Sequence, residues 1–233
     1  MLSLNKFFDH PAVVAFTSDA AIDFTLNESA PALTGAQQSY LSEGAGISVS
    51  ALAWARQVHG SQVIVADEGL LSGSLKEADA FVTDCKNIPI AIRTADCLPI
   101  FLFDPPHQAI GIVHAGWKGT QKEIVKETFE VMQGIYKTDC EDILVGFGPS
   151  IRNCCYEVGK DVARYFPNAT STHNGKLFID LIKANRDQLF SLGVERPQLF
   201  DARICTACDR NYFSFRRDKE KAGRMVSVMM IKG

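Results

Sequence analysis

Cys97 and His114 occupy corresponding ends of two short apolar runs, one over residues 98–103 and one over 109–113. The Pro-containing segment 104–107 separates the runs, and this pattern predicts an antiparallel hairpin. If the turn is centred between the two prolines, Cys97 faces His114 directly. The Cβ atoms of such cross-strand partners lie roughly 4.5–5.5 Å apart. A thiol and an imidazole this close can share a metal ion or a proton.

His59, in the segment Gln57-Val58-His59-Gly60, is a third candidate ligand. One thiolate and two imidazoles leave the fourth position of a tetrahedral zinc ion open, which is typical of catalytic rather than structural zinc. A zinc ion in such a site makes hydroxide available near neutral pH. The trio of His59, Cys97 and His114 is therefore a candidate catalytic metal site.

The residues beside this trio also suit a reactive site. Asp96 can orient a ligand or accept a proton, and Gly116 and Gly119 leave the backbone open to a bound molecule. The same residues are also compatible with a metal-free cysteine nucleophile, in which His114 or His59 lowers the pKa of the thiol. We keep both interpretations.

Short strands and helices are expected to position these residues. Residues 62–65, 80–83, 88–92 and 142–147 have the apolar, β-rich composition of strands. Thr120 and Glu123 predict a capping box before a helix with an apolar stripe from Ile124 to Ile135. A second helix is expected over 158–166, and a third begins after Asp180 and ends before Gly193.

The fold class expected from this order is α/β, with a mixed sheet and helices packed on it. The first 50 residues show no clear helical stripe. Because there is no linker-like segment and no fixed-period repeat, residues 1–233 are expected to form one domain.

Composition excludes several classes of protein. The 46% hydrophobic and 22% charged residues are ordinary for a globular protein, and the net charge of −3 gives no electrostatic reason to expect nucleic acid or a membrane as partner. No apolar run approaches the roughly 20 residues of a membrane helix. Residues 1–16 do not resemble a signal peptide, so we expect a cytoplasmic protein. Its seven cysteines are then expected to be mostly free thiols.

Cys205 and Cys208 form a CxxC motif, but the sequence has no second CxxC. Because Cys154 and Cys155 are adjacent rather than spaced, a four-cysteine zinc site would need unusual geometry. A structural or site-lining role is favoured for the CxxC. The motifs of P-loop, dinucleotide-binding, α/β-hydrolase, zinc-protease and zinc-deaminase sites are absent from the sequence.

Seven blocks of unusual composition follow one another between Ala51 and Met225. They are Gln57-Val58-His59-Gly60, Thr94-Ala95-Asp96-Cys97-Leu98-Pro99, His114-Ala115-Gly116-Trp117-Lys118-Gly119, Gly148-Pro149-Ser150-Ile151, Tyr156-Glu157-Val158-Gly159, Phe213-Ser214-Phe215-Arg216-Arg217-Asp218 and Gly223-Arg224-Met225. In this order the blocks resemble the YfiH-like family. Members of this family were labelled multicopper polyphenol oxidases or laccase domains and are now regarded as purine nucleoside phosphorylases.

The resemblance implies a mixed α/β sandwich of the CNF-toxin/YfiH-like cysteine hydrolase fold, with zinc held by His59, Cys97 and His114. It implies transferase and hydrolase activity: phosphorolysis of adenosine, inosine and S-methyl-5'-thioadenosine to the base and a ribose 1-phosphate, and deamination of adenosine. Copper and the older oxidoreductase label rank lower, because a multicopper centre needs many histidines and the chain has five. A metal-free cysteine hydrolase and an inactive metal-holding interaction protein stay open, as does a homodimer.

Four cations in the matching blocks or directly beside them are candidates for binding phosphate: Arg93, Lys118, Arg216 and Arg224. Asp96 is the candidate for moving the proton in deamination. Residues 16–21 lack the Arg and Gly-Gly that family members usually carry near the N-terminus. Altered specificity or weaker phosphorolysis is therefore expected.

Overall fold

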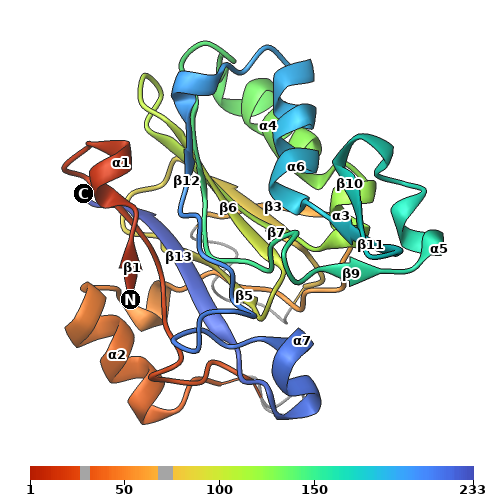
Figure 1. The fold of residues 1–233 in the computed structure, drawn as a ribbon. Helices are drawn as coiled ribbons and strands as arrows, with labels where there is room; N and C mark the ends of the chain where they lie inside the picture. The colour runs from red at the N-terminus through yellow and green to blue at the C-terminus, as the bar shows by residue number, and fades with distance from the viewer. Residues whose placement is uncertain (27–31, 68–75) are drawn as a thin grey trace.

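The computed structural model describes residues 1–26, 32–67 and 76–233, and its largest sheet runs through the centre of Figure 1. This six-stranded sheet has the order β12-β8-β6-β7-β4-β3. Its strands are β12 (Leu199–Asp201), β8 (Leu144–Phe147), β6 (Leu98–Asp104), β7 (Ala109–Ala115), β4 (Ala80–Thr83) and β3 (Val63–Val65). Antiparallel pairs form its middle, whereas β12 with β8 and β3 with β4 are parallel. The predicted mixed sheet is confirmed.

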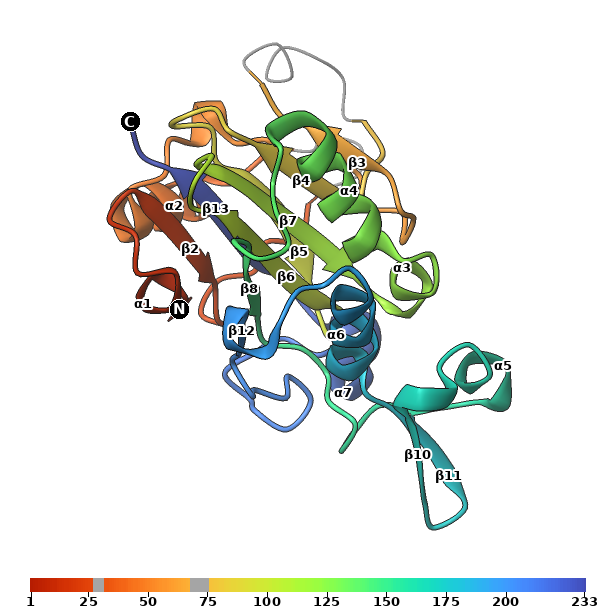
Figure 2. The ribbon, with the colours of Figure 1, turned by 90° about the horizontal axis from the view of Figure 1, so that it is seen from above.

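A second sheet joins the two ends of the chain in the order β1-β2-β13-β5. It consists of β1 (Leu2–Ser3), β2 (Val13–Thr17), β13 (Met225–Ile231) and β5 (Ile90–Thr94). All its neighbours are antiparallel. A small third sheet has the order β10-β11-β9 and contains β10 (Thr170–His173), β11 (Lys176–Ile179) and β9 (Glu157–Val158). It extends away from the two larger sheets (Figure 2).

The helices are short. They are α1 (Asn5–Phe8), α2 (Gly35–Ala45), α3 (Trp117–Gln121), α4 (Ile124–Tyr136), α5 (Lys160–Ala163), α6 (Leu181–Ser191) and α7 (Phe215–Asp218), with 3-10 turns at Val49–Ala51, Pro167–Ala169, Arg196–Gln198 and Lys219–Lys221. Across the described residues, none has the length and apolar character needed to cross a membrane.

The two larger sheets pack face to face because their strands alternate between two apolar faces. Ile100 and Leu102 of β6 belong to the cluster covered by α4 and α6, whereas Phe101 and Phe103 pack toward β13 of the other sheet. On the outer face of the four-stranded sheet, α2 contributes Leu41 to a third cluster. The layers are therefore helix, sheet, sheet and helix (Figures 1 and 2).

The hairpin of β6 and β7 forms as predicted, but its register is shifted by two residues. His114 pairs with Pro99 rather than facing Cys97. The turn contains four residues, because Asp104 pairs with Ala109 and its buried carboxylate accepts a hydrogen bond from the backbone of His107. A shift of two keeps every side chain on its face. Cys97 therefore remains at the same end of the hairpin as His114.

The helix boundaries differ from the predictions at two places. Glu123 has a φ of 57°, so α3 and α4 are separate helices, and α4 has no side-chain cap. Thr120 instead lies in α3 and accepts a hydrogen bond from Asn185 of α6. The predicted helix 158–166 is reduced to α5, because Val158 belongs to β9. The predicted cap of α6 is confirmed, since Asp180 accepts the N–H of Lys183.

Candidate active site

A cavity of about 920 Å³ lies where the ends of β5 and β7 meet α3 and α7. The eight residues proposed from the sequence all line it: His59, Arg93, Asp96, Cys97, His114, Lys118, Arg216 and Arg224. They come from segments that are far apart in the chain. The fold therefore brings these eight residues to one place, together with Gly116, whereas Gly119 is packed against Gly60 and does not line the cavity.

His59, Cys97 and His114 lie close enough to bind one ion. Their ligand atoms all lie within 4.8 Å of one another, and the rings of the two histidines are 4.9 Å apart at an interplanar angle of 69°. His59 has a φ of 56°, a conformation that turns the loop 57–60 back toward the sheet. One sulfur and two ring nitrogens that face a cavity fit a catalytic zinc ion with an open position.

Asp79 positions two members of this trio, and the sequence analysis did not identify it. Its buried carboxylate accepts the backbone N–H groups of Val58, His59 and Gly60 at 3.2, 3.0 and 2.7 Å. The same carboxylate is 2.7 Å from Nδ1 of His114. Burial favours the neutral acid, but the bonds from His114 and the backbone amides lower the pKa of Asp79 overall.

The hydrogen bond that Nδ1 of His114 donates to Asp79 determines which nitrogen of the ring is available. Because Nδ1 is held by the carboxylate, Nε2 is the nitrogen left for Cys97 or a metal. A carboxylate behind a histidine ligand is the usual arrangement for fixing the ring orientation of a metal-binding histidine. In the sequence, Asp79 lies between two alanines just before β4, so no local motif indicated its role.

We expect Asp79→Asn to lower metal affinity about 10- to 100-fold, the usual cost of losing the outer partner of a histidine ligand. An asparagine side chain has only one acceptor oxygen for the three backbone N–H groups and the His114 ring that now donate to Asp79. Competition for zinc with a chromophoric chelator measures the change. Asp104→Asn is a matched control, because Asp104 is also a buried partner of a histidine, His107, outside the cavity. Equal zinc affinities in the two variants would contradict the assigned role.

Within the trio, the charges of Cys97 and His114 stabilise each other. Burial favours the neutral thiol, but the charge of His114 and the hydrogen bonds from His114 and His59 lower the pKa of Cys97 to about 6. Burial opposes the charged form of His114 as well, yet the Cys97 thiolate and Asp79 raise the pKa of that imidazole to about 9. Without a metal, the stable state at neutral pH is a thiolate beside an imidazolium.

We expect iodoacetamide to alkylate Cys97 rapidly in metal-stripped protein, with a half-maximal rate near pH 6. The pKa of Cys97 is lowered, so the thiolate persists as the pH falls to about 6 and is protonated below it. Mass spectrometry of the modified peptide measures the rate. Cys140 is the internal comparison, because burial and nearby acids raise the pKa of its thiol. A Cys97 rate that rises only near pH 8.5, the range of an ordinary thiol, would contradict the coupling.

Asp96 connects the trio to the C-terminal part of the chain. Its buried carboxylate accepts the hydroxyl of Thr206 at 2.7 Å and the backbone N–H of Arg216 at 2.6 Å. Its φ of 83° is unusual for a residue other than glycine. Such strain at a cavity wall is typical of functional sites. Asp96 therefore holds the segment that carries Arg216 against the loop that carries Cys97.

The cavity wall is rich in cations, although the whole chain has a net charge of −3. Besides the four predicted residues, Arg56 and Lys219 line it. The guanidinium of Arg216 donates to the carbonyl of Glu157 and lies 5.5 Å from the centre of the Tyr156 ring. That of Arg224 donates to the carbonyl of Ala222. A concave surface with this charge attracts small anions.

Aromatic side chains form another part of the wall. Trp117, Tyr156 and Phe215 all line the cavity, and Phe215 is exposed. Flat apolar side chains beside a few polar groups are typical of sites for planar organic ligands.

The other three histidines lie outside the cavity lining. His10 packs against Phe103, His107 bonds to Asp104 in the β6–β7 turn, and His173 contacts Phe178 in the third sheet. Only two of the five histidines therefore reach the site.

Comparisons with known proteins point to one family, although its members carry different names. A family model described as multi-copper polyphenol oxidoreductase laccase matches residues 25–232. A protein of Aquifex aeolicus (strain VF5) named purine nucleoside phosphorylase is 37% identical over 155 residues, which are 66% of this chain and 72% of the relative. A protein from an unknown prokaryotic organism, named adenosine deaminase RL5, is 34% identical over 198 residues, 77% of this chain and 74% of the relative. The crystal structure of the Bacillus licheniformis hypothetical protein YfiH has a TM-score of 0.87 at 26% identity and covers 100% of this chain and 96% of that chain.

Proposed function

This chain belongs to the YfiH-like family, whose sequence model is described as multi-copper polyphenol oxidoreductase laccase, and we propose that it is a zinc-dependent purine nucleoside enzyme. The proposed reactions are phosphorolysis of adenosine, inosine and S-methyl-5'-thioadenosine and deamination of adenosine. Relatives that bear the names purine nucleoside phosphorylase and adenosine deaminase support this proposal.

One observation carries the proposal: a three-ligand cluster, several cations and aromatic side chains share a single cavity. Phosphorolysis needs a place for phosphate, a place for a planar base and a group that stabilises the departing base. Nζ of Lys118 lies 5.7 Å from the centre of the Trp117 ring, and the guanidinium of Arg216 lies 5.5 Å from that of Tyr156. The cavity thus provides sites for both parts of a nucleoside and for the anion that attacks it.

The residues of the cavity have separate proposed tasks. Arg93, Lys118, Arg216 and Arg224 neutralise the phosphate, since fixed cations bind it by charge-assisted hydrogen bonds. The new bond joins a phosphate oxygen to C1' of the ribose while the bond from C1' to the purine nitrogen breaks, and the base leaves as an anion that must be protonated. Asp96 is the proposed carrier of the proton in deamination.

His59, Cys97 and His114 fit a zinc ion, which when bound would supply a Lewis acid and an activated water. Asp79 keeps the proton on Nδ1 of His114 and thereby directs Nε2 inward. Copper is less consistent with the site. A multicopper centre needs many imidazole ligands, and His59 and His114 are the only histidines among the described residues that line the cavity.

We also propose that residues 1–233 form one catalytic domain of the cysteine hydrolase fold. The core between the two larger sheets takes Val13 and Met229 from one sheet and Phe101 and Ile112 from the other. Residues 16–21, which lack the family Arg and Gly-Gly, are not among the described residues that line the cavity. Altered specificity or weaker phosphorolysis remains our expectation.

A metal-free cysteine hydrolase is the second candidate, because Cys97 and His114 form a thiolate and imidazolium pair when no metal is present. Such a pair is typical of an activated cysteine nucleophile. The two candidates differ in their response to chelators. A hydrolase of this kind keeps its activity after metal removal, whereas the zinc enzyme loses it.

Incubation of the purified protein with adenosine, with and without phosphate, tests the proposal. Liquid chromatography separates adenine and ribose 1-phosphate, the products of phosphorolysis, from inosine, the product of deamination. We expect adenine only when phosphate is present. Inosine should accumulate without phosphate, and with phosphate part of it should be converted to hypoxanthine. An absence of both products in zinc-loaded protein would refute the proposed function.

A further inference from the structure

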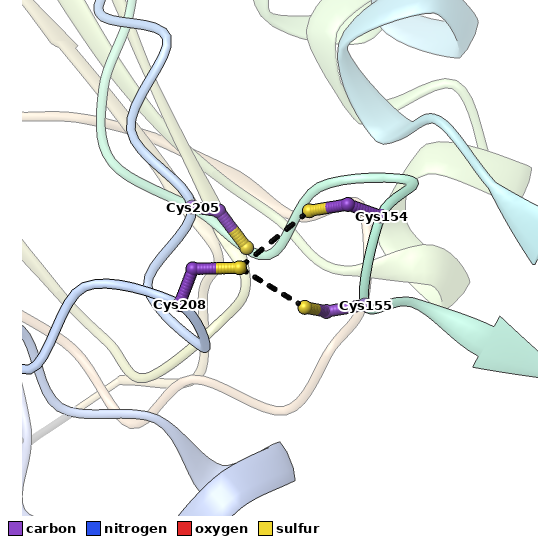
Figure 3. Close-up of side chains that lie close together, drawn as sticks. All are labelled: Cys154, Cys155, Cys205 and Cys208. Carbon is purple, nitrogen blue, oxygen red and sulfur yellow. Dashed lines mark hydrogen bonds between the residues drawn. The ribbon is translucent and has the colours of Figure 1, made fainter.

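A second cluster of sulfur atoms lies outside the cavity lining. It contains Cys154 and Cys155, from the loop between β8 and β9, and Cys205 and Cys208, from the segment after β12. Figure 3 shows the four side chains pointing toward one another from these two segments. Their sulfur atoms all lie within 4.8 Å of one another, and all four cysteines are free thiols.

The distances suit a tetrahedral ion. Sγ of Cys208 lies 3.3 Å from that of Cys155 and 3.7 Å from that of Cys154. Four sulfurs around a zinc ion at a Zn–S distance of about 2.3 Å are about 3.8 Å apart. Only small movements of the side chains are therefore needed to place an ion at the centre.

The backbone around Cys205 holds the two cysteine-bearing segments together. The carbonyl of Cys205 accepts the N–H groups of Cys208 and Asp209, which closes a tight turn. The N–H of Thr206 donates to the carbonyl of Ser150, and this bond connects the turn to the loop that carries the other two cysteines.

We propose that Cys154, Cys155, Cys205 and Cys208 form a structural zinc site, separate from the cavity trio. Four protein sulfurs fill all positions of a tetrahedral ion and leave none for substrate, which is typical of structural rather than catalytic zinc. A set of four sulfurs also selects zinc or iron over harder ions. Cys154 and Cys208 are exposed, so an ion can enter from solvent.

The site would clamp two segments, one of which lines the cavity while the other supports Asp96 in its wall. Thr206, between the two cysteines of the CxxC motif, donates to Asp96. The guanidinium of Arg217 donates to the carbonyl of Thr206. On the other segment, Tyr156 directly follows Cys155 and lines the cavity. The metal would thus maintain the position of Asp96 and of the Arg216 segment without contacting substrate.

Metal analysis of four proteins tests the site, with zinc measured by plasma mass spectrometry after dialysis. We expect about two equivalents in the wild type and about one in Cys97→Ala, which retains only the second site. We expect about one in Cys208→Ser as well. Cys140→Ser is the matched control, since Cys140 belongs to neither cluster, and it should keep about two. No tightly bound zinc in Cys97→Ala would overturn the proposal.

X-ray absorption at the zinc edge of Cys97→Ala gives a test that does not require Cys208→Ser to fold. We expect a shell of four sulfurs at about 2.3 Å from zinc. A shell of nitrogen or oxygen would overturn the proposal. So would a disulfide among the four cysteines in freshly purified wild-type protein, detected by mass spectrometry without reduction.

Discussion

Replacing Cys97 by alanine is expected to lower kcat/KM for both phosphorolysis and deamination by more than about 100-fold, because even an outer partner of a metal ligand is worth about 10- to 100-fold. The change removes the only sulfur of the trio and leaves two imidazoles facing the cavity. It also removes the thiolate to which His114 is coupled. Both reactions should therefore decline together, and one equivalent of metal should be lost.

Chromatography of adenosine reactions with and without phosphate measures both rates in the same samples. Cys85→Ala is the control, because Cys85 is half-buried just after β4 and belongs neither to the trio nor to the four-cysteine cluster. It should retain the wild-type rates. Wild-type rates in Cys97→Ala would exclude Cys97 and its metal from both mechanisms.

Gly116→Ala is expected to lower kcat/KM about 100-fold, the cost of a displacement of about 1 Å in a reacting site. A Cβ at position 116 would lie 2.9 Å from Sγ of Cys97 and 3.2 Å from Cδ2 of His59. Both neighbours are metal-ligand candidates, so one of them must move. The backbone itself accepts alanine, since φ is −73°. The clash alone therefore determines the effect.

Two further variants separate the clash from other effects of the substitution. Gly116 is the N-cap of α3, and serine at this position supplies a capping oxygen while introducing the same Cβ. Gly116→Ser should therefore lose as much activity as Gly116→Ala. Gly134→Ala in α4, where a Cβ meets nothing within 4 Å, should keep full activity and gain roughly 0.5–1 kcal/mol of stability. Full activity in both variants of Gly116 would contradict the proposed position of the ligands.

Local patterns were sufficient to predict some of the fold. The apolar runs on either side of Pro105 predicted the β6–β7 hairpin, and Asp180 predicted the start of α6. The register could not be predicted, because the side chain of Asp104 sets the length of the turn by bonding to His107. The Asn174-Gly175 turn of β10 and β11, with φ values of 50° and 75°, was a hairpin signal that the sequence analysis did not use.

Contacts between distant segments account for most of what was missed. β2 lies in the middle of a sheet because β13 pairs with it from the opposite end of the chain, and no pattern within residues 13–17 indicates that partner. Asp79 is a site residue because the loop 57–60 folds over it, and that contact is visible only in the structure. The four cysteines outside the cavity meet because the segments that follow the parallel strands β8 and β12 lie side by side.

Residue chemistry was the more reliable guide to the site. His59, Cys97 and His114 were chosen for their ligand types, and the structure places their ligand atoms together although the predicted pairing of Cys97 with His114 is wrong. An error of two residues preserves the face of a strand, so it left the site intact. Arg56 and Lys219 were missed because a cation on a loop carries no signal of the cavity it will face.

Diffraction data from crystals of the zinc-loaded protein, collected on both sides of the zinc absorption edge, test the central claim most directly. We predict an anomalous peak for a zinc ion at about 2.3 Å from Sγ of Cys97 and about 2.0–2.1 Å from one ring nitrogen each of His59 and His114. The remaining side of the ion should face the cavity. A map without a peak at these three residues, in crystals that contain zinc elsewhere, would contradict the claim that they form a catalytic metal site.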